Sequence, residues 1–136
     1  MGKRRRAREL ALQILYGMEI NKGDLSCVLS GFWKAYPCSE EIQRFATELV
    51  TGTYKNLSSI DNLLRKHTDN WDISRLAAVD RNVLRFATYE LLFLDDIPPK
   101  VTINEAIEIV KNYSTADSGK FVNGILDKIK DEKLNP

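Results

Sequence analysis

Apolar residues recur at helical spacing along almost the whole chain, and this periodicity constrains the fold more than any other feature. In the first such segment the apolar residues follow the i, i+3, i+4, i+7 pattern of one helix face. Similar segments predict helices near residues 7–21, 25–35, 39–50, 58–66, 79–94, 102–110 and 122–129. No alternating pattern of useful length predicts a strand. The sequence therefore predicts an all-α fold of six or seven helices joined by short loops.

Polar residues predict where several of these helices begin. Ser39 and Ser58 each stand where a serine hydroxyl could accept a hydrogen bond from a backbone N–H of the first turn. Thr102 and Glu105 have the spacing of a capping box, in which both side chains satisfy backbone donors at the helix start. The polar residues 114–119 predict a turn, after which Phe121 would open the last helix.

The length of 136 residues predicts a single domain, residues 1–136, that buries about two-thirds of its unfolded surface. A composition of 43% hydrophobic and 29% charged residues is typical of a soluble protein. No run of about 18 apolar residues could span a bilayer. The two cysteines, Cys27 and Cys38, are too few for a disulfide framework and lack the CxxC spacing of zinc sites. We interpret them as packed or surface thiols.

No pattern in the sequence is typical of a catalytic or metal site. The chain has neither a nucleophile with its base, nor a metal-ligand cluster, nor a glycine-rich phosphate loop. The single histidine, His67, has no close Cys or His partner, and we interpret it as structural or incidental. Glu90 lies on the apolar face of a helix, where we expect an ion pair with Arg81, Arg85 or a group elsewhere in the fold. The sequence predicts neither an enzyme nor a cofactor.

Basic residues concentrate at the N-terminus, although the formal net charge of the chain is only +1. Cations at a helix N-terminus oppose the helix dipole by about 0.3 to 1 kcal/mol each, so helix stability does not explain them. An anionic ligand would remove this penalty, and guanidinium groups suit phosphate because they donate several hydrogen bonds in one plane. The sequence therefore predicts RNA binding, with a solvated charged terminus and a cleaved transit peptide left open. These residues, here called the basic cluster, are Lys3, Arg4, Arg5, Arg6 and Arg8.

Two aromatic residues lie near cations in the sequence and could stack on RNA bases. Tyr16 lies two turns after Arg8 on the predicted first helix, and Phe121 directly follows Lys120. Stacking of a base on an aromatic ring is typically worth about 1 to 3 kcal/mol. A buried position in the core is the alternative for both rings.

Three groups of motifs occur in a specific order along the chain. They are RRRARE at residues 4–9 with LY at 15–16, then VLRFATYEL at 83–91, and finally INEA at 103–106 with FVNGILD at 121–127. In their order, separation and helical placement they resemble the NusB family of bacterial transcription antitermination factors, over nearly the whole chain. The resemblance implies a bundle of two three-helix subdomains with an extra helix.

The same resemblance implies a function and a set of site residues. It implies cytoplasmic binding to the boxA element of ribosomal RNA leader transcripts together with a small-subunit ribosomal protein, which then joins other elongation factors on RNA polymerase to suppress termination. The RNA-facing positions of the family match the basic cluster, Tyr16, Lys120 and Phe121. The neighbourhood where the ribosomal protein docks matches Asp80, Arg81, Tyr89, Asp117 and Ser118. Residues 23–39, including Trp33, match no motif, and a homodimer such as some members form stays open.

Two other interpretations belong to different functional classes. The same fold occurs as the N-terminal domain of ribosomal RNA cytosine methyltransferases, which need a larger cofactor-binding domain after it. We expect none here, because the sequence ends at Pro136. The second is a protein-only adaptor whose basic cluster contacts acidic proteins or lipid surfaces.

Overall fold

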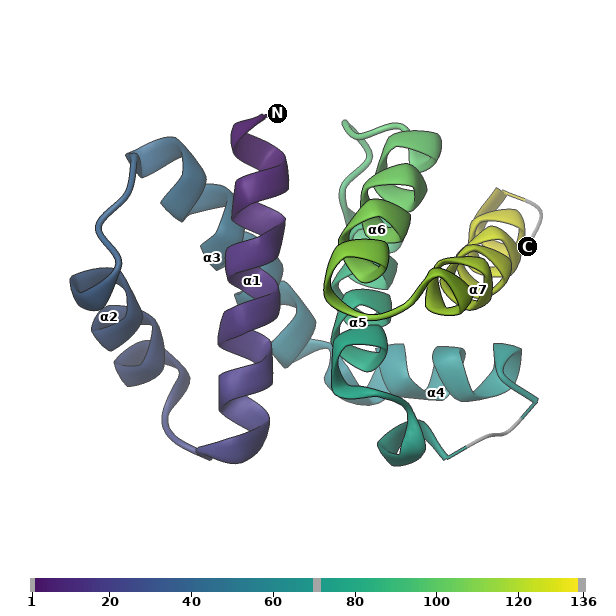
Figure 1. The fold of residues 1–136 in the computed structure, drawn as a ribbon, viewed down its shortest axis with the longest axis horizontal. Coiled ribbons are helices and arrows are strands. Elements are labelled where there is room, and N and C mark those ends of the chain that lie inside the picture. Colours follow the sequence, from purple (N-terminus) through teal and green to yellow (C-terminus); the bar gives the residue numbers. More distant parts are fainter. Residues whose placement is uncertain (1, 70–71, 135–136) are drawn as a thin grey trace. The chain divides into compact units, whose positions relative to one another are not determined.

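The described residues of the chain, 2–69 and 72–134 of the computed structural model, form seven α-helices, one short 3-10 helix and no strand (Figure 1). The all-α prediction is confirmed, and the predicted segment 25–35 coincides with a helix. The helices are α1 (Lys3–Ile20), α2 (Leu25–Ala35), α3 (Glu40–Lys55), α4 (Leu57–His67), α5 (Ala78–Phe93), α6 (Pro99–Tyr113) and α7 (Ala116–Leu134), with the 3-10 helix η1 (Ile73–Arg75) before α5.

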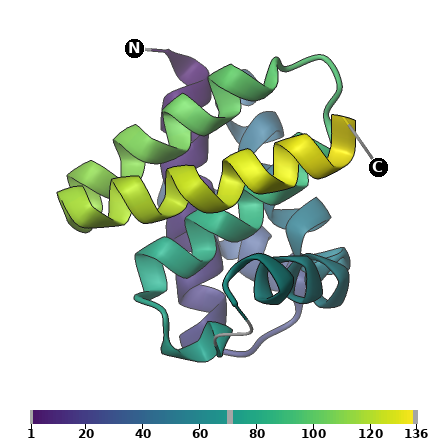
Figure 2. The ribbon, with the colours of Figure 1, turned by 90° about the vertical axis from the view of Figure 1, so that its right-hand side faces the viewer.

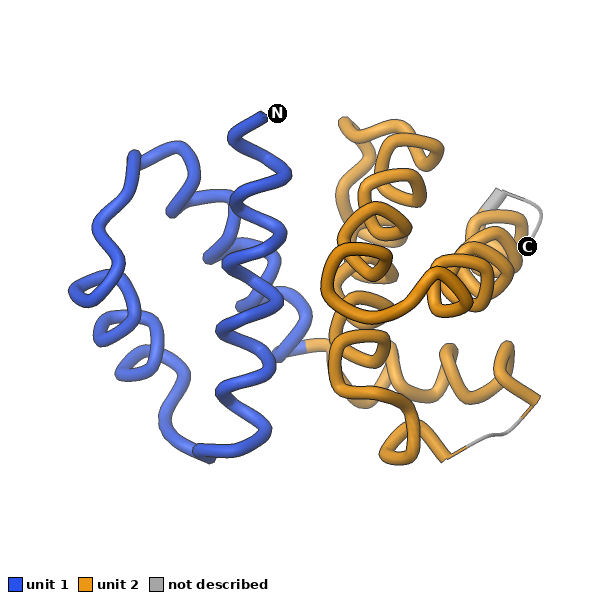
Figure 3. The backbone as a smooth tube through the Cα atoms, viewed as in Figure 1, with its two compact units in different colours: residues 1–55 blue, residues 56–136 orange. Residues whose placement is uncertain are grey.

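The chain divides into two compact units, residues 1–55 and residues 56–136 (Figure 3). The first unit holds α1, α2 and α3, and the second holds α4 to α7 with η1. Three helices in one unit and four in the other agree with two three-helix subdomains and an extra helix. That both units act as one RNA-binding domain stays a prediction.

The packing of α1 against α3 forms the core of the first unit. Ala7 and Leu10 of α1 are buried against Ala46 of α3, and the half-buried Phe32 and Trp33 of α2 pack on the same cluster. The indole N–H of Trp33 donates to the Thr47 hydroxyl at 3.1 Å. Residues 23–39, for which the sequence alone indicated no motif, contain α2, whose apolar side chains are only partly buried. The homodimer stays a prediction.

In the second unit, α5 packs against α4, α6 and α7. Figure 2 shows α7, in yellow, beside α6, in green, within this unit. Its core contains the apolar faces that the periodicity predicts for each helix. The buried side chains include Ile60 and Leu64 of α4, Val83, Phe86 and Leu91 of α5, Ile103, Ala106 and Val110 of α6, and Val122, Ile125, Leu126 and Ile129 of α7.

The two serines predicted as helix caps behave differently. The Ser39 hydroxyl accepts a hydrogen bond from the backbone N–H of Ile42 at 3.3 Å, which confirms it as the cap of α3. The cap predicted at Ser58 is wrong, because α4 already begins at Leu57 and its N-cap residue is Asn56. The backbone at Asn56 turns directly from α3 into α4, which leaves Ser58 in the first helical turn.

The capping box predicted at Thr102 is also wrong, because α6 begins earlier, at Pro99. A proline suits the first helical turn, since its missing N–H needs no partner there. Thr102 is buried inside α6 instead, and its hydroxyl donates to Glu90 Oε1 at 3.0 Å. The buried Glu90 thus has a hydroxyl partner where the sequence favoured an ion pair. Arg85 forms a bidentate ion pair with Asp61, both distances being 2.9 Å.

The turn predicted over residues 114–119 is shorter than expected. The Thr115 hydroxyl accepts a hydrogen bond from the Ser118 backbone N–H at 3.0 Å, so the chain enters α7 at Ala116. Phe121 therefore lies in the second turn of α7 rather than at its start. Asp117 and Ser118 lie in the first turn.

His67 ends α4 and contacts Glu132 of α7, which agrees with a structural role. Hydrogen bonds from Lys66 first and His67 second hold the pKa of Glu132 below its ordinary value. Cys27 is an exposed free thiol and Cys38 a half-buried one. Among the described residues, no group of His, Cys, Asp and Glu could hold a metal ion. Within those same residues, every helix is too short or too polar to cross a membrane.

Candidate nucleic-acid interface

The basic cluster occupies the first two turns of α1. Helix α1 begins at Lys3 with no acidic residue in its first turn and no side-chain cap. Gly2 before it has a φ of 65°, in the left-handed region that favours glycine. The backbone N–H groups of a first helical turn have no intrahelical acceptor, and the dipole makes this end of the helix positive. Side chains and backbone together therefore present positive charge at this end of α1.

The five members of the basic cluster differ in exposure. Lys3, Arg4 and Arg6 are exposed and Arg5 is half-buried. Arg8 is only 2% exposed, so its guanidinium is much less accessible to a ligand than the charged groups of the other members. The members accessible to a polyanion are therefore the first four.

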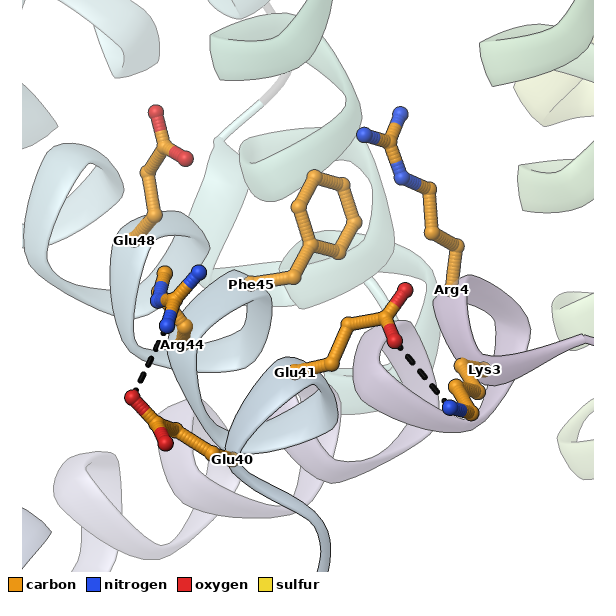
Figure 4. A pocket seen from close by; sticks show the side chains of 7 residues that line it. All are labelled: Lys3, Arg4, Glu40, Glu41, Arg44, Phe45 and Glu48. Atoms are coloured by element: carbon orange, nitrogen blue, oxygen red, sulfur yellow. Dashed lines mark hydrogen bonds and ion pairs between the residues drawn. The ribbon is translucent and has the colours of Figure 1, made fainter.

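An aromatic ring from α3 lies beneath two of these guanidinium groups. The Phe45 ring centroid is 4.8 Å from the Arg4 guanidinium carbon and 5.4 Å from that of Arg8. Cations at this distance from a ring face are attracted to its electron density. Figure 4 shows the Phe45 ring, from α3, beside the Arg4 side chain, from α1. Phe45 thus restricts where the Arg4 guanidinium lies.

A hollow of about 560 Å³ lies between the start of α1 and the first turns of α3 (Figure 4). Its wall combines three cations, three carboxylates and one aromatic ring. Lys3 Nζ lies 3.1 Å from Glu41 Oε2, and Arg44 donates to Glu40 Oε1 at 2.8 Å. The lining residues are Lys3, Arg4, Glu40, Glu41, Arg44, Phe45 and Glu48. Glu41 thus pairs with a member of the basic cluster, whereas Glu40 pairs with a cation of its own helix.

The aromatic residues predicted to stack on RNA bases are both accessible. Tyr16 of α1 is 45% exposed and Phe121 of α7 is 39% exposed, so neither ring is a buried core residue. Lys120, beside Phe121, is exposed as well. Tyr16 shares α1 with the basic cluster, whereas Lys120 and Phe121 belong to the second unit.

Four of the five residues predicted to bind the ribosomal protein lie at the starts of α5 and α7, namely Asp80, Arg81, Asp117 and Ser118. The Ser118 hydroxyl donates to Asp80 Oδ2 at 2.8 Å, and both residues are buried. Asp80 Oδ1 is buried without a hydrogen-bond partner among the described residues. Asp117 is exposed next to Ser118.

Arg81, directly after Asp80, and Tyr89, farther along α5, have other contacts. Arg81 donates to the Leu76 carbonyl at 2.6 Å, which ties the start of α5 to the preceding residues. Tyr89 is half-buried and stacks on Phe93 with a centroid distance of 5.1 Å. Phe93 is 50% exposed, and no motif in the sequence selected it.

The α3 residues beside the basic cluster, among them Glu41, Arg44 and Phe45, are ones that sequence reasoning missed. The periodicity places Phe45 on the apolar face of its helix, and nothing in the sequence distinguishes Glu41 or Arg44 from other surface charges. Only the packing of α1 on α3 brings them to the basic cluster.

These features define an all-helical protein with a group of exposed cations at the start of one helix. Residues 5–131 match the NusB family, and the chain belongs to that family. The transcription antitermination protein NusB of Thermodesulfovibrio yellowstonii is 42% identical, with 97% of this chain and 94% of the relative covered. The family prediction made from the three groups of motifs is confirmed, and with it the class of transcription antitermination factors.

Solved structures of the family have the same fold. T. maritima NusB is 44% identical with a TM-score of 0.85, covering 98% of this chain and 97% of that one. A crystal structure of the antitermination factors NusB and NusE in complex with double-stranded RNA contains a chain that is 28% identical, with a TM-score of 0.87. The match covers 97% of this chain and 98% of that one.

Proposed function

We propose that this chain binds the boxA element of ribosomal RNA leader transcripts together with a small-subunit ribosomal protein. In this proposal the complex joins other elongation factors on RNA polymerase in the cytoplasm and helps the polymerase read through terminators. The chain acts by binding and has no catalytic step of its own. The observation that carries the proposal is the group of exposed cations at the uncapped start of α1.

Physical chemistry favours RNA as the ligand of the basic cluster. Helix N-termini bind phosphate readily because free N–H groups and the dipole both favour negative charge. Guanidinium groups add bidentate hydrogen bonds to phosphate oxygens. The exposed rings of Tyr16 and Phe121 offer stacking surfaces for unpaired bases, which phosphate contacts alone cannot read. Cations and rings together suit single-stranded RNA better than a lipid surface or an acidic protein.

The ribosomal protein is proposed to dock at the starts of α5 and α7. The buried Asp80 carboxylate accepts a hydrogen bond from Ser118, which holds the start of α7 against α5 and fixes the surface that the ribosomal protein would contact. The exposed Asp117 adds negative charge nearby. In the related complex, the partner of NusB is NusE. A basic segment of the ribosomal protein is the partner that this surface suits.

The direct test is an anisotropy titration of labelled boxA RNA and a scrambled RNA, with and without the ribosomal protein. We expect tighter binding to boxA than to the scrambled RNA, and a further gain when the ribosomal protein is present. Equal affinity for both RNAs in the presence of the ribosomal protein would contradict sequence-specific function. A gain from an unrelated basic protein of similar size would contradict the proposed partner.

Replacing Phe45 with Leu is expected to weaken RNA binding about two- to fivefold. The aliphatic side chain still fills space but no longer attracts the Arg4 guanidinium, an interaction worth about 0.5 to 1 kcal/mol at exposed sites. Phe32→Leu is the matched control, because Phe32 is a half-buried aromatic residue of the same unit. Equal RNA affinities of the two variants would refute a role for the Phe45 ring.

Replacing Ser118 with Ala is expected to weaken binding of the ribosomal protein about fivefold. The change removes the hydrogen bond to the buried Asp80 carboxylate, worth about 1 kcal/mol, and so loosens the start of α7 relative to α5. Isothermal calorimetry with the ribosomal protein measures the effect. Ser59→Ala on the exposed face of α4 is the control and should bind like the unchanged protein. If Ser118→Ala also binds normally, docking at this place is contradicted.

A further inference from the structure

The basic cluster already has an intramolecular anion beside it. Lys3 of α1 pairs with Glu41 of α3 across the two helices, with 3.1 Å between Nζ and Oε2. Figure 4 shows the Glu41 carboxylate directed at Lys3, while the carboxylate of Glu40 is directed at Arg44. Glu41 is therefore an α3 carboxylate that reaches the basic cluster.

Helix electrostatics explain why the two charges stand where they do. A carboxylate in the first turn of α3 is favoured by the dipole of that helix, whereas Lys3 in the first turn of α1 is disfavoured. The ion pair with Glu41 offsets part of the unfavourable interaction between Lys3 and the dipole of α1. A phosphate bound at the start of α1 would offset the same unfavourable interaction.

From this we infer that Glu41 competes with RNA phosphates for the basic cluster and thereby limits how tightly the cluster holds RNA of any sequence. Carboxylate and phosphate oxygens accept the same charge-assisted hydrogen bonds from an ammonium group. Phosphate binding at Lys3 must displace or share the Glu41 contact, and this cost lowers the affinity for RNA.

The exposure of the pair makes such an exchange feasible. The Lys3 side chain is 59% exposed and that of Glu41 is 69% exposed. Exposed ion pairs are weak, so an incoming phosphate can replace the carboxylate without disturbing the helices. Because phosphate contacts carry no base information, the competition suppresses binding to wrong sequences as well as right ones. Because Glu41 lowers the affinity for all RNA sequences alike, only the contacts with bases distinguish one sequence from another.

This inference rests on the proposed function, and Glu41→Gln tests it. The amide keeps the shape of the side chain but removes its charge. We expect RNA binding about two- to fivefold tighter at low salt, for boxA and scrambled RNA alike, with the gain shrinking as salt rises. Asp127→Asn on α7 is the matched control, because it removes one partly exposed carboxylate paired with a lysine in the second unit. It should change affinity much less.

A double-mutant cycle with Lys3→Met separates local competition from general charge effects. The gain from Glu41→Gln should largely vanish in the Lys3→Met background. A gain of the same size in that background, or one matched by Asp127→Asn, would overturn the inference.

If the unchanged protein binds no RNA in these titrations, the proposed function itself fails. If it binds RNA and Glu41→Gln binds no more tightly, only the competition fails. Circular dichroism checks that all variants keep their helicity.

Discussion

Replacing Arg4, Arg5 and Arg6 together with Gln is expected to weaken RNA binding about 100-fold at about 0.1 M salt. Each phosphate contact with single-stranded RNA contributes about 0.7 to the slope of log affinity against log salt. At that salt concentration one contact is worth about fivefold, and three are worth about 100-fold. The loss should be nearly the same for boxA and scrambled RNA, because phosphate contacts do not read bases. An anisotropy titration measures both.

The control for this variant is the replacement of Lys22, Lys34 and Lys55 with Gln. These lysines are exposed, lie in the same unit outside the basic cluster, and change the net charge equally. The control should lose little affinity. The arginine variant should unfold at a temperature no lower than the unchanged protein, because cations at the start of α1 oppose its dipole. Equal losses in both triple variants would mean that net charge, and not the basic cluster, governs binding.

Replacing Phe121 with Ala is expected to reduce affinity for boxA RNA about tenfold or more, with a smaller loss for scrambled RNA. A base stacked on an aromatic ring is worth about 1 to 3 kcal/mol. Since the ring is 39% exposed, its removal leaves no large cavity in the core. The ratio of the two affinities, from paired titrations, reports the discrimination.

Tyr54→Ala is the control for this change, because Tyr54 is a similarly exposed ring on α3 and belongs to no predicted site. It should leave both affinities unchanged. A loss in Phe121→Ala that is equal for the two RNAs, or that follows a drop in unfolding temperature, would assign the ring a packing role instead.

The periodic apolar faces made most of the fold predictable. Residues such as Leu10, Val83 and Leu126 fall at helical spacing, and burial of these faces defines the helices. Helix starts were less predictable, because several residue types can serve the same purpose. Pro98 is the N-cap residue of α6 and Pro99 is its first residue, so the helix starts at Pro99 and not at Thr102.

The candidate site was predictable only where its residues lie close in sequence. The basic cluster is one such run, and its composition alone predicts the same RNA-binding role for all five members. Helical spacing could have set Arg8 apart, because Ala11, Leu12 and Leu15 on the same face are all buried. The contributions of Glu41 and Phe45 could not be predicted, because they depend on how α1 and α3 pack.

The salt dependence of RNA binding by the unchanged protein with its ribosomal partner tests the central claim most directly. Lys3, Arg4 and Arg6 are exposed together at the start of α1, and contact of all three with phosphates predicts a slope of about −2 or steeper for log affinity against log salt. A flat dependence, or no binding to RNA at low salt, would contradict a polyanion site at this helix end.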